Sequence, residues 1–134
     1  MPLIRPAFLL AALLFAATPV FAHDDATLDA ATAPHGGQLR MAGIHHFELI
    51  VDAKTGSLLV YVTDHAGSKT AVAGATGSAT LLSGSIKTAL ELKPDGDNRM
   101  KGVGTYSAAP GVKVIVWITL PGQAAAQARF TPKV

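Results

Sequence analysis

The sequence predicts an all-β protein, a single immunoglobulin-like antiparallel β-sandwich that follows a cleaved signal peptide. Roughly six to eight short segments rich in β-branched and aromatic residues recur about every ten residues, and turn-forming residues separate them. No long amphipathic helical pattern competes with these strands. The chain has no cysteine, which excludes the core disulfide of antibody domains and any thiolate metal ligand.

The N-terminal segment, residues 1–22, has the pattern of a secretory signal peptide. Arg5 supplies a positive charge, residues 7–17 form an apolar run, and the segment ends in small residues at Ala22. The apolar run is too short to span a bilayer comfortably, so we expect no membrane-embedded mature protein. Cleavage after Ala22 would make His23 the first residue of an exported, periplasmic protein.

The charges of the chain give no indication of a nucleic-acid partner. The sequence has 11 basic and 9 acidic residues, and removal of Arg5 with the leader leaves 10 against 9. The lysines are scattered through turns and strand faces rather than gathered in one stripe. We therefore expect no nucleic-acid binding.

Residues 23–33 are expected to form a flexible N-terminal arm before a sandwich domain of residues 34–134. Alanine, aspartate and threonine dominate the arm without an apolar period, and Pro34 disfavours helix in the residue before it. His23 is then either the end of a disordered arm or a copper chelator. In the second case, its free amino group and its ring nitrogen would bind the ion together.

Eight segments have strand patterns, and we take them in chain order. The expected strands are residues 38–41, 44–51, 57–63, 78–82, 86–92, 99–106, 112–120 and 125–131. The last segment is rich in alanine and would equally suit a short helix. Residues 112–120 give the clearest strand pattern, and Trp117 is expected on or near the core. Residues 71–77 are too small and flexible for a central strand, so a loop or an edge piece is expected there.

The hairpin formed by residues 44–51 and 57–63 carries the candidate site. A register in which Asp52 faces Ser57 places six apolar residues on one face of the hairpin. The opposite face then carries His46, Glu48, Tyr61, Thr63 and His65. His45 falls on the apolar face, and a slip of one residue would mix the two sets.

The histidines are concentrated around this hairpin, because four of the five lie between residues 35 and 65. In a chain without thiols, imidazole, carboxylate and thioether groups are the available metal ligands. His46 and His65 would be diagonal neighbours about 7 Å apart, a span that two imidazoles can bridge through one ion. Glu48 would be a ligand or an acceptor that fixes an imidazole tautomer. The predicted metal ligands are His35, His46, Glu48 and His65, with Asp64 and Met41 as weaker candidates.

Catalytic motifs are absent from the sequence, which has no nucleophile elbow, phosphate-binding loop or HExxH. We therefore expect a protein that is not an enzyme. Two other interpretations stay open. One is a structural or protein-interaction sandwich whose histidines are incidental, and the other is a small copper oxidoreductase.

The segments PHGGQL, GIHHFELIVD and LLVYVTDHAG, followed by ATLLSG and LELKPDGDNRMKG, resemble a known group of domains. These are small periplasmic domains associated with bacterial heavy-metal and copper efflux systems, including segments attached to their membrane-fusion adaptors. The resemblance covers roughly residues 34–120. It implies that the protein buffers or carries copper, zinc or another late divalent ion in a metal tolerance system, with a metal-efflux complex as a partner. It also points to His35, His46, Glu48 and His65 as the metal-binding positions.

Overall fold

The computed structural model describes residues 23–134, and the expected signal peptide, residues 1–22, lies outside the described residues. One short helix, α1 (Asp25–Ala30), precedes eight strands. The strands are β1 (Gln38–Ala42), β2 (His45–Asp52), β3 (Ser57–Asp64), β4 (Thr76–Ser83), β5 (Ile86–Pro94), β6 (Arg99–Val103), β7 (Lys113–Thr119) and β8 (Ala126–Phe130). The alanine-rich segment that would suit either a strand or a helix is therefore a strand, β8.

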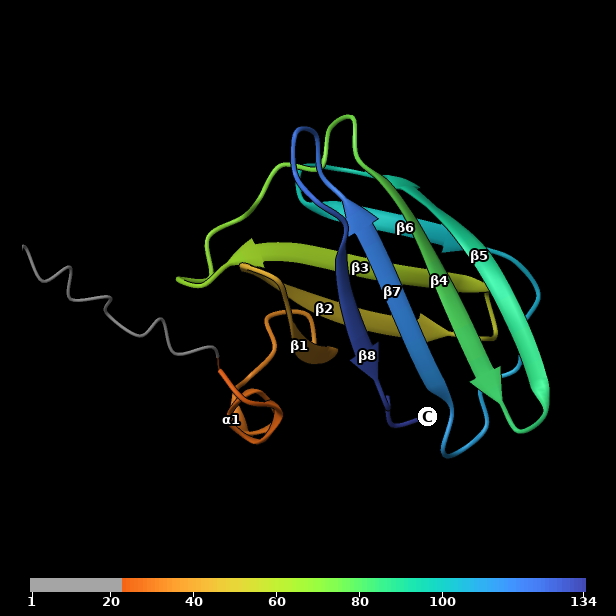
Figure 1. Ribbon diagram of the computed structural model, residues 1–134. Helices are drawn as coiled ribbons and strands as arrows, with labels where there is room; N and C mark the ends of the chain where they lie inside the picture. The colour runs from red at the N-terminus through yellow and green to blue at the C-terminus, as the bar shows by residue number, and fades with distance from the viewer. Residues whose placement is uncertain (1–22) are drawn as a thin grey trace, which may run out of the picture.

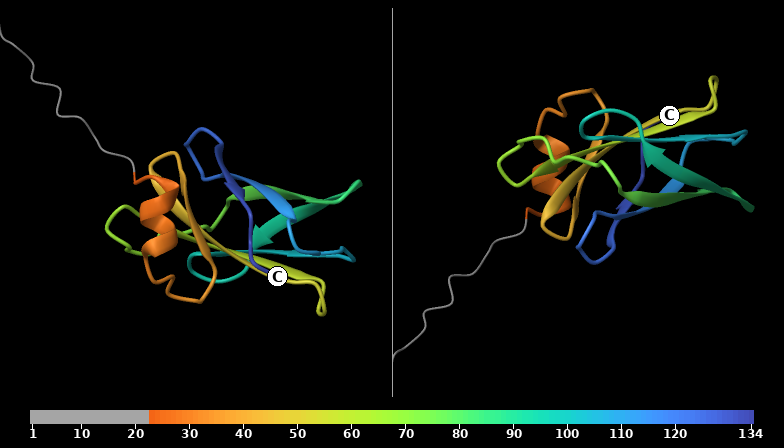
Figure 2. Two further views of the ribbon diagram at one scale, coloured as in Figure 1. Left: turned by 90° about the horizontal axis from the view of Figure 1, so that it is seen from below. Right: turned by 90° about the horizontal axis from the view of Figure 1, so that it is seen from above.

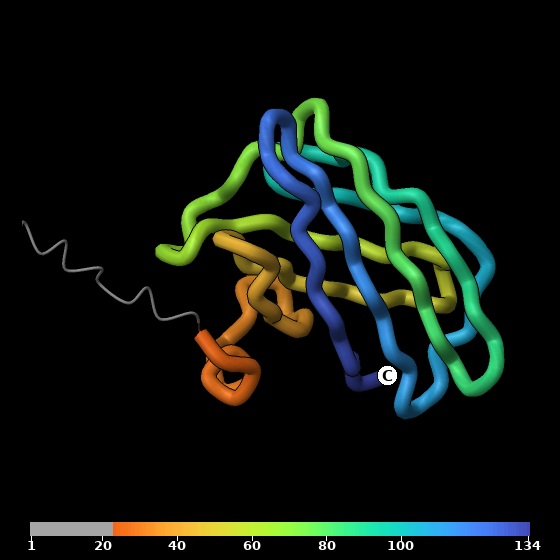
Figure 3. The backbone as a smooth tube through the Cα atoms, viewed as in Figure 1, coloured from red at the N-terminus to blue at the C-terminus, as the bar shows by residue number. Residues whose placement is uncertain are grey.

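The strands form one antiparallel sheet in the order β1-β2-β3-β6-β5-β4-β7-β8, which is nearly closed like a barrel. The layer that contains β2, β3 and β6 is crossed at a steep angle by the layer that contains β4, β7 and β8 (Figure 1). A long connection, residues 65–75, carries the chain from β3 in one layer to β4 in the other (Figure 3). The prediction of an all-β antiparallel sandwich is confirmed in this barrel-like form.

Side-chain hydrogen bonds link the two outermost strands of the sheet. The side chain of Gln38, at the start of β1, accepts from the backbone N–H of Thr131 at 2.9 Å and donates to its carbonyl oxygen at 3.4 Å. Thr131 follows the last residue of β8. The barrel is therefore nearly closed at this point without a ladder of backbone bonds between β1 and β8.

The hairpin of β2 and β3 has the predicted register, with Asp52 opposite Ser57 and His46 opposite Thr63. Its apolar face contributes to a core built from both layers. The largest fully buried side chains include Phe47, Leu49, Leu58, Leu81, Leu92 and Phe130. The polar face of the hairpin therefore points away from the core, as the alternation of the sequence predicts.

Trp117 does not lie in the core, because its side chain is 43% exposed. On β7, Val116 and Ile118 are fully or almost fully buried. Successive residues of a strand point to opposite faces, so Trp117 points outwards between them. The prediction that Trp117 lies on or near the core is wrong, because the alternation of β7 turns Val116 and Ile118 inwards and the indole ring outwards.

The segment expected as a flexible arm contains helix α1, which packs against β1 at one end of the molecule (Figure 2). Asp24 is the N-cap of α1, and its side chain accepts a hydrogen bond of 2.8 Å from the backbone of Thr27. Leu28 is 4% exposed. Leu28 is the one buried residue of this six-residue helix, so the segment shows no repeating apolar face, which is why the helix was not predicted.

Arg40 on β1 fixes α1 to the barrel. Its guanidinium group lies 2.8 Å from the carboxylate of Asp29 and 3.4 Å from that of Asp25. Arg40 is buried, so its charge needs these partners.

Within residues 23–134, no helix is long and apolar enough to cross a membrane.

Candidate metal centre

Three histidine rings from separate parts of the chain meet beside α1. These are His23, His46 and His65, here called the three-histidine cluster. One ring nitrogen of each lies within 4.8 Å of the other two. The ring centroids are 5.3, 5.3 and 5.2 Å apart, and the rings are tilted by 44° to 49° rather than stacked. The nearly equal spacings mean that the three rings surround one point and could hold a metal ion there.

The spacing of the nitrogens suits a transition-metal ion. Nδ1 of His23 lies 3.2 Å from Nε2 of His46. Two imidazole nitrogens at about 2.0–2.1 Å from a tetrahedral ion are roughly 3.3–3.4 Å apart. The first pair therefore already has roughly the separation of two ligands of one ion, and the nitrogen of His65 lies within 4.8 Å of both.

Each ring of the cluster is positioned by a different local structure. His46 points outwards from β2, and it is buried because the N-terminal segment covers this face. His65 lies in the turn that follows β3. The carboxylate of Asp64 accepts 2.9 Å hydrogen bonds from the backbone of Ala66 and Ser68 and so shapes this turn. Asp64, a weaker candidate ligand, therefore already has a turn-forming role.

Burial lowers the pKa of His46, and the neighbouring rings of His65 and His23 lower it further. Asp64 opposes this effect by favouring the charged form. The net direction keeps the imidazole of His46 neutral at pH 7. A neutral ring has a free lone pair, which is the form that binds a metal.

Glu48 and His35, the two other predicted ligands, are paired with each other rather than placed in the cluster. Oε1 of Glu48 lies 2.8 Å from Nδ1 of His35. Oε2 of Glu48 accepts 2.9 Å hydrogen bonds from the backbone N–H groups of His35 and Gly37. The Glu48 carboxylate is 3% exposed, and three donors satisfy it. The carboxylate therefore holds the turn before β1. The role of an acceptor that fixes the imidazole tautomer of a metal ligand stays a prediction.

The two glycines of the PHGGQL segment make this pairing feasible. Gly36 has a φ of +75°, which side chains rarely adopt. A Cβ atom at Gly37 would press against the carbonyl oxygen of Leu49 and come within 3.0 Å of Cγ of Glu48. The turn can therefore approach β2 closely enough to donate to Glu48 only with glycine at this position.

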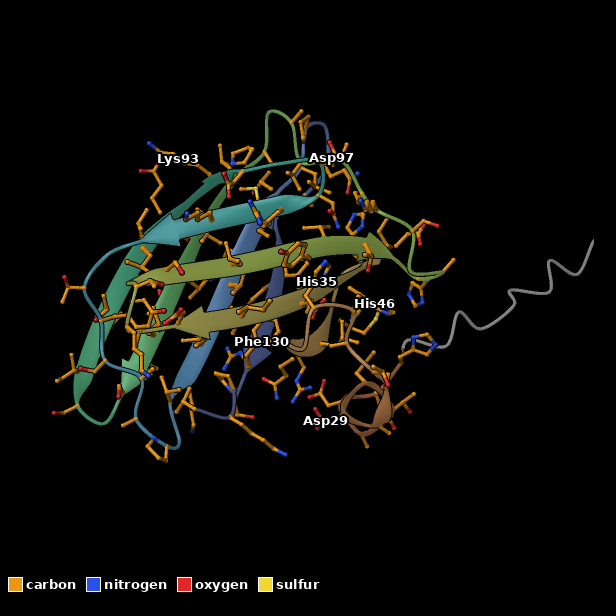
Figure 4. All side chains as sticks on the ribbon, turned by 180° about the vertical axis from the view of Figure 1, so that it is seen from behind. Asp29, His35, His46, Lys93, Asp97 and Phe130 are labelled. Atoms are coloured by element: carbon orange, nitrogen blue, oxygen red, sulfur yellow. The ribbon has the colours of Figure 1, made fainter. Side chains whose placement is uncertain are left out.

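A cavity of about 290 Å³ connects the two arrangements. His35 stacks on Tyr61 of β3, with ring centroids 3.6 Å apart and planes 5° from parallel. The cavity is lined by all three histidines of the cluster and also by His35, Glu48 and Tyr61. Figure 4 shows His35 and His46 near the end of the barrel where α1 lies, marked by Asp29. The three-histidine cluster is therefore open to a small space.

His45 is directed away from the cluster, as strand parity predicts. Its Nε2 lies 2.9 Å from the side-chain oxygen of Gln123, in the turn between β7 and β8. Its Nδ1 is buried without a hydrogen-bond partner, the one such side-chain atom among residues 23–134. Met41 lies opposite His46 across β1 and β2, so its side chain shares the face of His46.

The structure brings together two of the four predicted ligands, His46 and His65, and adds His23. The sequence contained one signal for His23, its place directly after the expected cleavage site. Its approach to the hairpin depends on α1, which the sequence did not predict.

Comparisons with protein-family models, curated proteins and solved structures each found no match.

Proposed function

We propose that this protein is an exported metal-binding protein that buffers or carries copper or another late divalent ion in the periplasm. The observation that supports it best is the convergence of His23, His46 and His65 on one point. Imidazole is a common ligand of copper, zinc and nickel, and copper binds most tightly in the general order of affinities. A metal tolerance or efflux system is the setting in which we place this role, with an efflux complex as the partner.

The position of the cluster favours a cargo ion over a structural one. The apolar core of the barrel is built without the three rings. Three protein nitrogens leave at least one coordination position for water or for a ligand from another molecule. The adjoining cavity provides space for that ligand. An ion held in this way can be exchanged without unfolding the barrel, as a buffer or a carrier requires.

The protein, purified without an affinity tag, is expected to bind about one equivalent of Cu(II) in the presence of a mild competing chelator. The triple variant H23A/H46A/H65A removes the cluster and is expected to lose this binding, while its thermal midpoint without metal shows whether it folds. Titration followed by dialysis and metal analysis measures the bound copper of the natural chain and of the triple variant. A folded triple variant that still takes up one equivalent would contradict the proposal and favour an interaction domain with incidental histidines.

The affinity is expected to fall as the pH falls from about 7 to 5. Protons compete with the metal for imidazole nitrogens, whose ordinary pKa is about 6.5. The free protein then binds more protons than the metal-bound protein, so the affinity decreases with acidity. Burial lowers the pKa of His46, so protons begin to compete with the metal for this ring at a lower pH than for an ordinary histidine. Competition with a chelator measures Kd at each pH. The slope of log Kd against pH should correspond to the release of more than one proton per bound ion, and a flat profile would contradict a multi-histidine site.

A further inference from the structure

We propose that the α-amino group of His23, freed by cleavage after Ala22, is a fourth nitrogen ligand of the metal centre. Export processing would then complete the site. This inference rests on the proposed function, since it concerns the same ion. It goes further by assigning the ligand set and by making tight metal binding a property of the processed chain alone.

The orientation of the His23 ring is the main observation. The nitrogen that faces Nε2 of His46, at 3.2 Å, is Nδ1 of His23. Nδ1 is the ring nitrogen closer to the backbone of its own residue. An ion on Nδ1 closes a six-membered ring with the α-nitrogen through Cα, Cβ and Cγ. Nε2 of the same ring points away from the backbone and cannot close this chelate, so the observed orientation is the one that chelation requires.

The backbone next to His23 is held in place. Asp24 caps α1, and its side chain accepts from the backbone of Thr27 at 2.8 Å. The helix is tied to β1 through the ion pair of Asp29 with buried Arg40, at 2.8 Å. The backbone that follows His23 is therefore held in position beside the hairpin. Little additional ordering is needed for its nitrogens to meet those of His46 and His65, and preorganisation of this kind increases affinity.

Cleavage changes the chemistry of the backbone α-nitrogen of His23. Before cleavage it is a peptide nitrogen, whose lone pair is delocalised into the carbonyl group, so it is a much weaker ligand than an amine. After cleavage it is an amine, which releases its proton when it binds the ion. The precursor thus offers three imidazoles and the processed chain offers three imidazoles and an amine. A set of four nitrogen ligands is one that Cu(II) accepts.

The experiment compares the processed chain that begins at His23 with a chain that carries Ser-Gly-Ser-Pro before His23. The proline nitrogen carries no hydrogen, so it cannot lose one to bind the ion beside His23. Residues 23–134 contain all eight strands and the core, so both chains keep the barrel. Intact mass establishes the start of the exported protein. Competition with a chelator measures the Cu(II) affinity, and electron paramagnetic resonance measures the number of coordinated nitrogens.

We expect the exported protein to begin at His23 and to bind Cu(II) at least thirtyfold more tightly than the extended chain. Its spectrum should show one more coordinated nitrogen. Equal affinities and equal nitrogen counts would overturn the amine ligand and leave the three-histidine site standing. A start other than His23 would also overturn it. If neither folded chain binds copper, the proposed function fails as well, so the two failures are distinguishable.

Discussion

Replacing Glu48 with alanine is expected to lower the free energy of unfolding by about 2–4 kcal/mol without removing a metal ligand. The carboxylate is 3% exposed and accepts from the ring and backbone of His35 and from the backbone of Gly37. Hydrogen bonds to a charged group contribute more than neutral ones, and their loss leaves partly buried donors without a partner. Urea unfolding without metal measures the change.

Glu48→Gln is the matched variant, because it keeps the shape of the side chain and one carbonyl oxygen. It should recover part of the stability lost in Glu48→Ala. Both variants, measured below their unfolding transitions, should bind Cu(II) within about threefold of the natural chain, a difference of roughly 0.7 kcal/mol. A tenfold loss of affinity in a folded Glu48→Gln protein would show that this carboxylate is a ligand and that its pairing with His35 is not its main role.

Strand parity explains why most of the hairpin was predictable. Alternation fixed the faces of β2 and β3, because only one register keeps Phe47 and Leu49 on the buried side. The same argument correctly placed His46 near His65 and directed His45 elsewhere. This part of the site is local, so the sequence contains the information that positions it.

The division of the predicted ligands into two groups was not predictable from parity. His46 and Glu48 share a face but lie two residues apart, about 6.6–6.8 Å along the strand. Two different segments reach these positions: His23 lies over the first and the turn of His35 over the second. Which segment reaches which position depends on contacts of Gly37 and α1 that are distant in sequence from β2. Alternation along a strand contains no information about them.

Helix α1 illustrates the same limit of local patterns. A six-residue helix is too short to be stable from propensity alone, so it forms through tertiary contacts. Leu28 and the ion pairs of Arg40 supply those contacts. A composition of alanine, aspartate and threonine therefore suggests a flexible arm until the partner strand is known. The placement of His23 in the three-histidine cluster follows from this tertiary packing.

Substitution of single histidines gives the sharpest test of the cluster, because two adjacent residues of the same type should behave differently. His46→Ala and His65→Ala are each expected to weaken Cu(II) binding at least tenfold, about 1.4 kcal/mol. Each removes one of the nitrogens that converge within 4.8 Å. His45→Ala should have a markedly smaller effect on affinity, because the ring of His45 contacts Gln123 at 2.9 Å and lies outside the cluster.

The stability of each variant separates ligand loss from misfolding. His45 is 6% exposed, so His45→Ala leaves a cavity and should lower the thermal midpoint without metal. His65 is half-buried in the turn after β3, so His65→Ala should change that midpoint less than His45→Ala does while it weakens binding. If His65→Ala is stable but binds weakly, and His45→Ala is less stable but binds tightly, the loss of binding is caused by the loss of a ligand and not by misfolding. If His45→Ala abolishes binding while His46→Ala retains it, with both proteins folded, the cluster is not the metal centre.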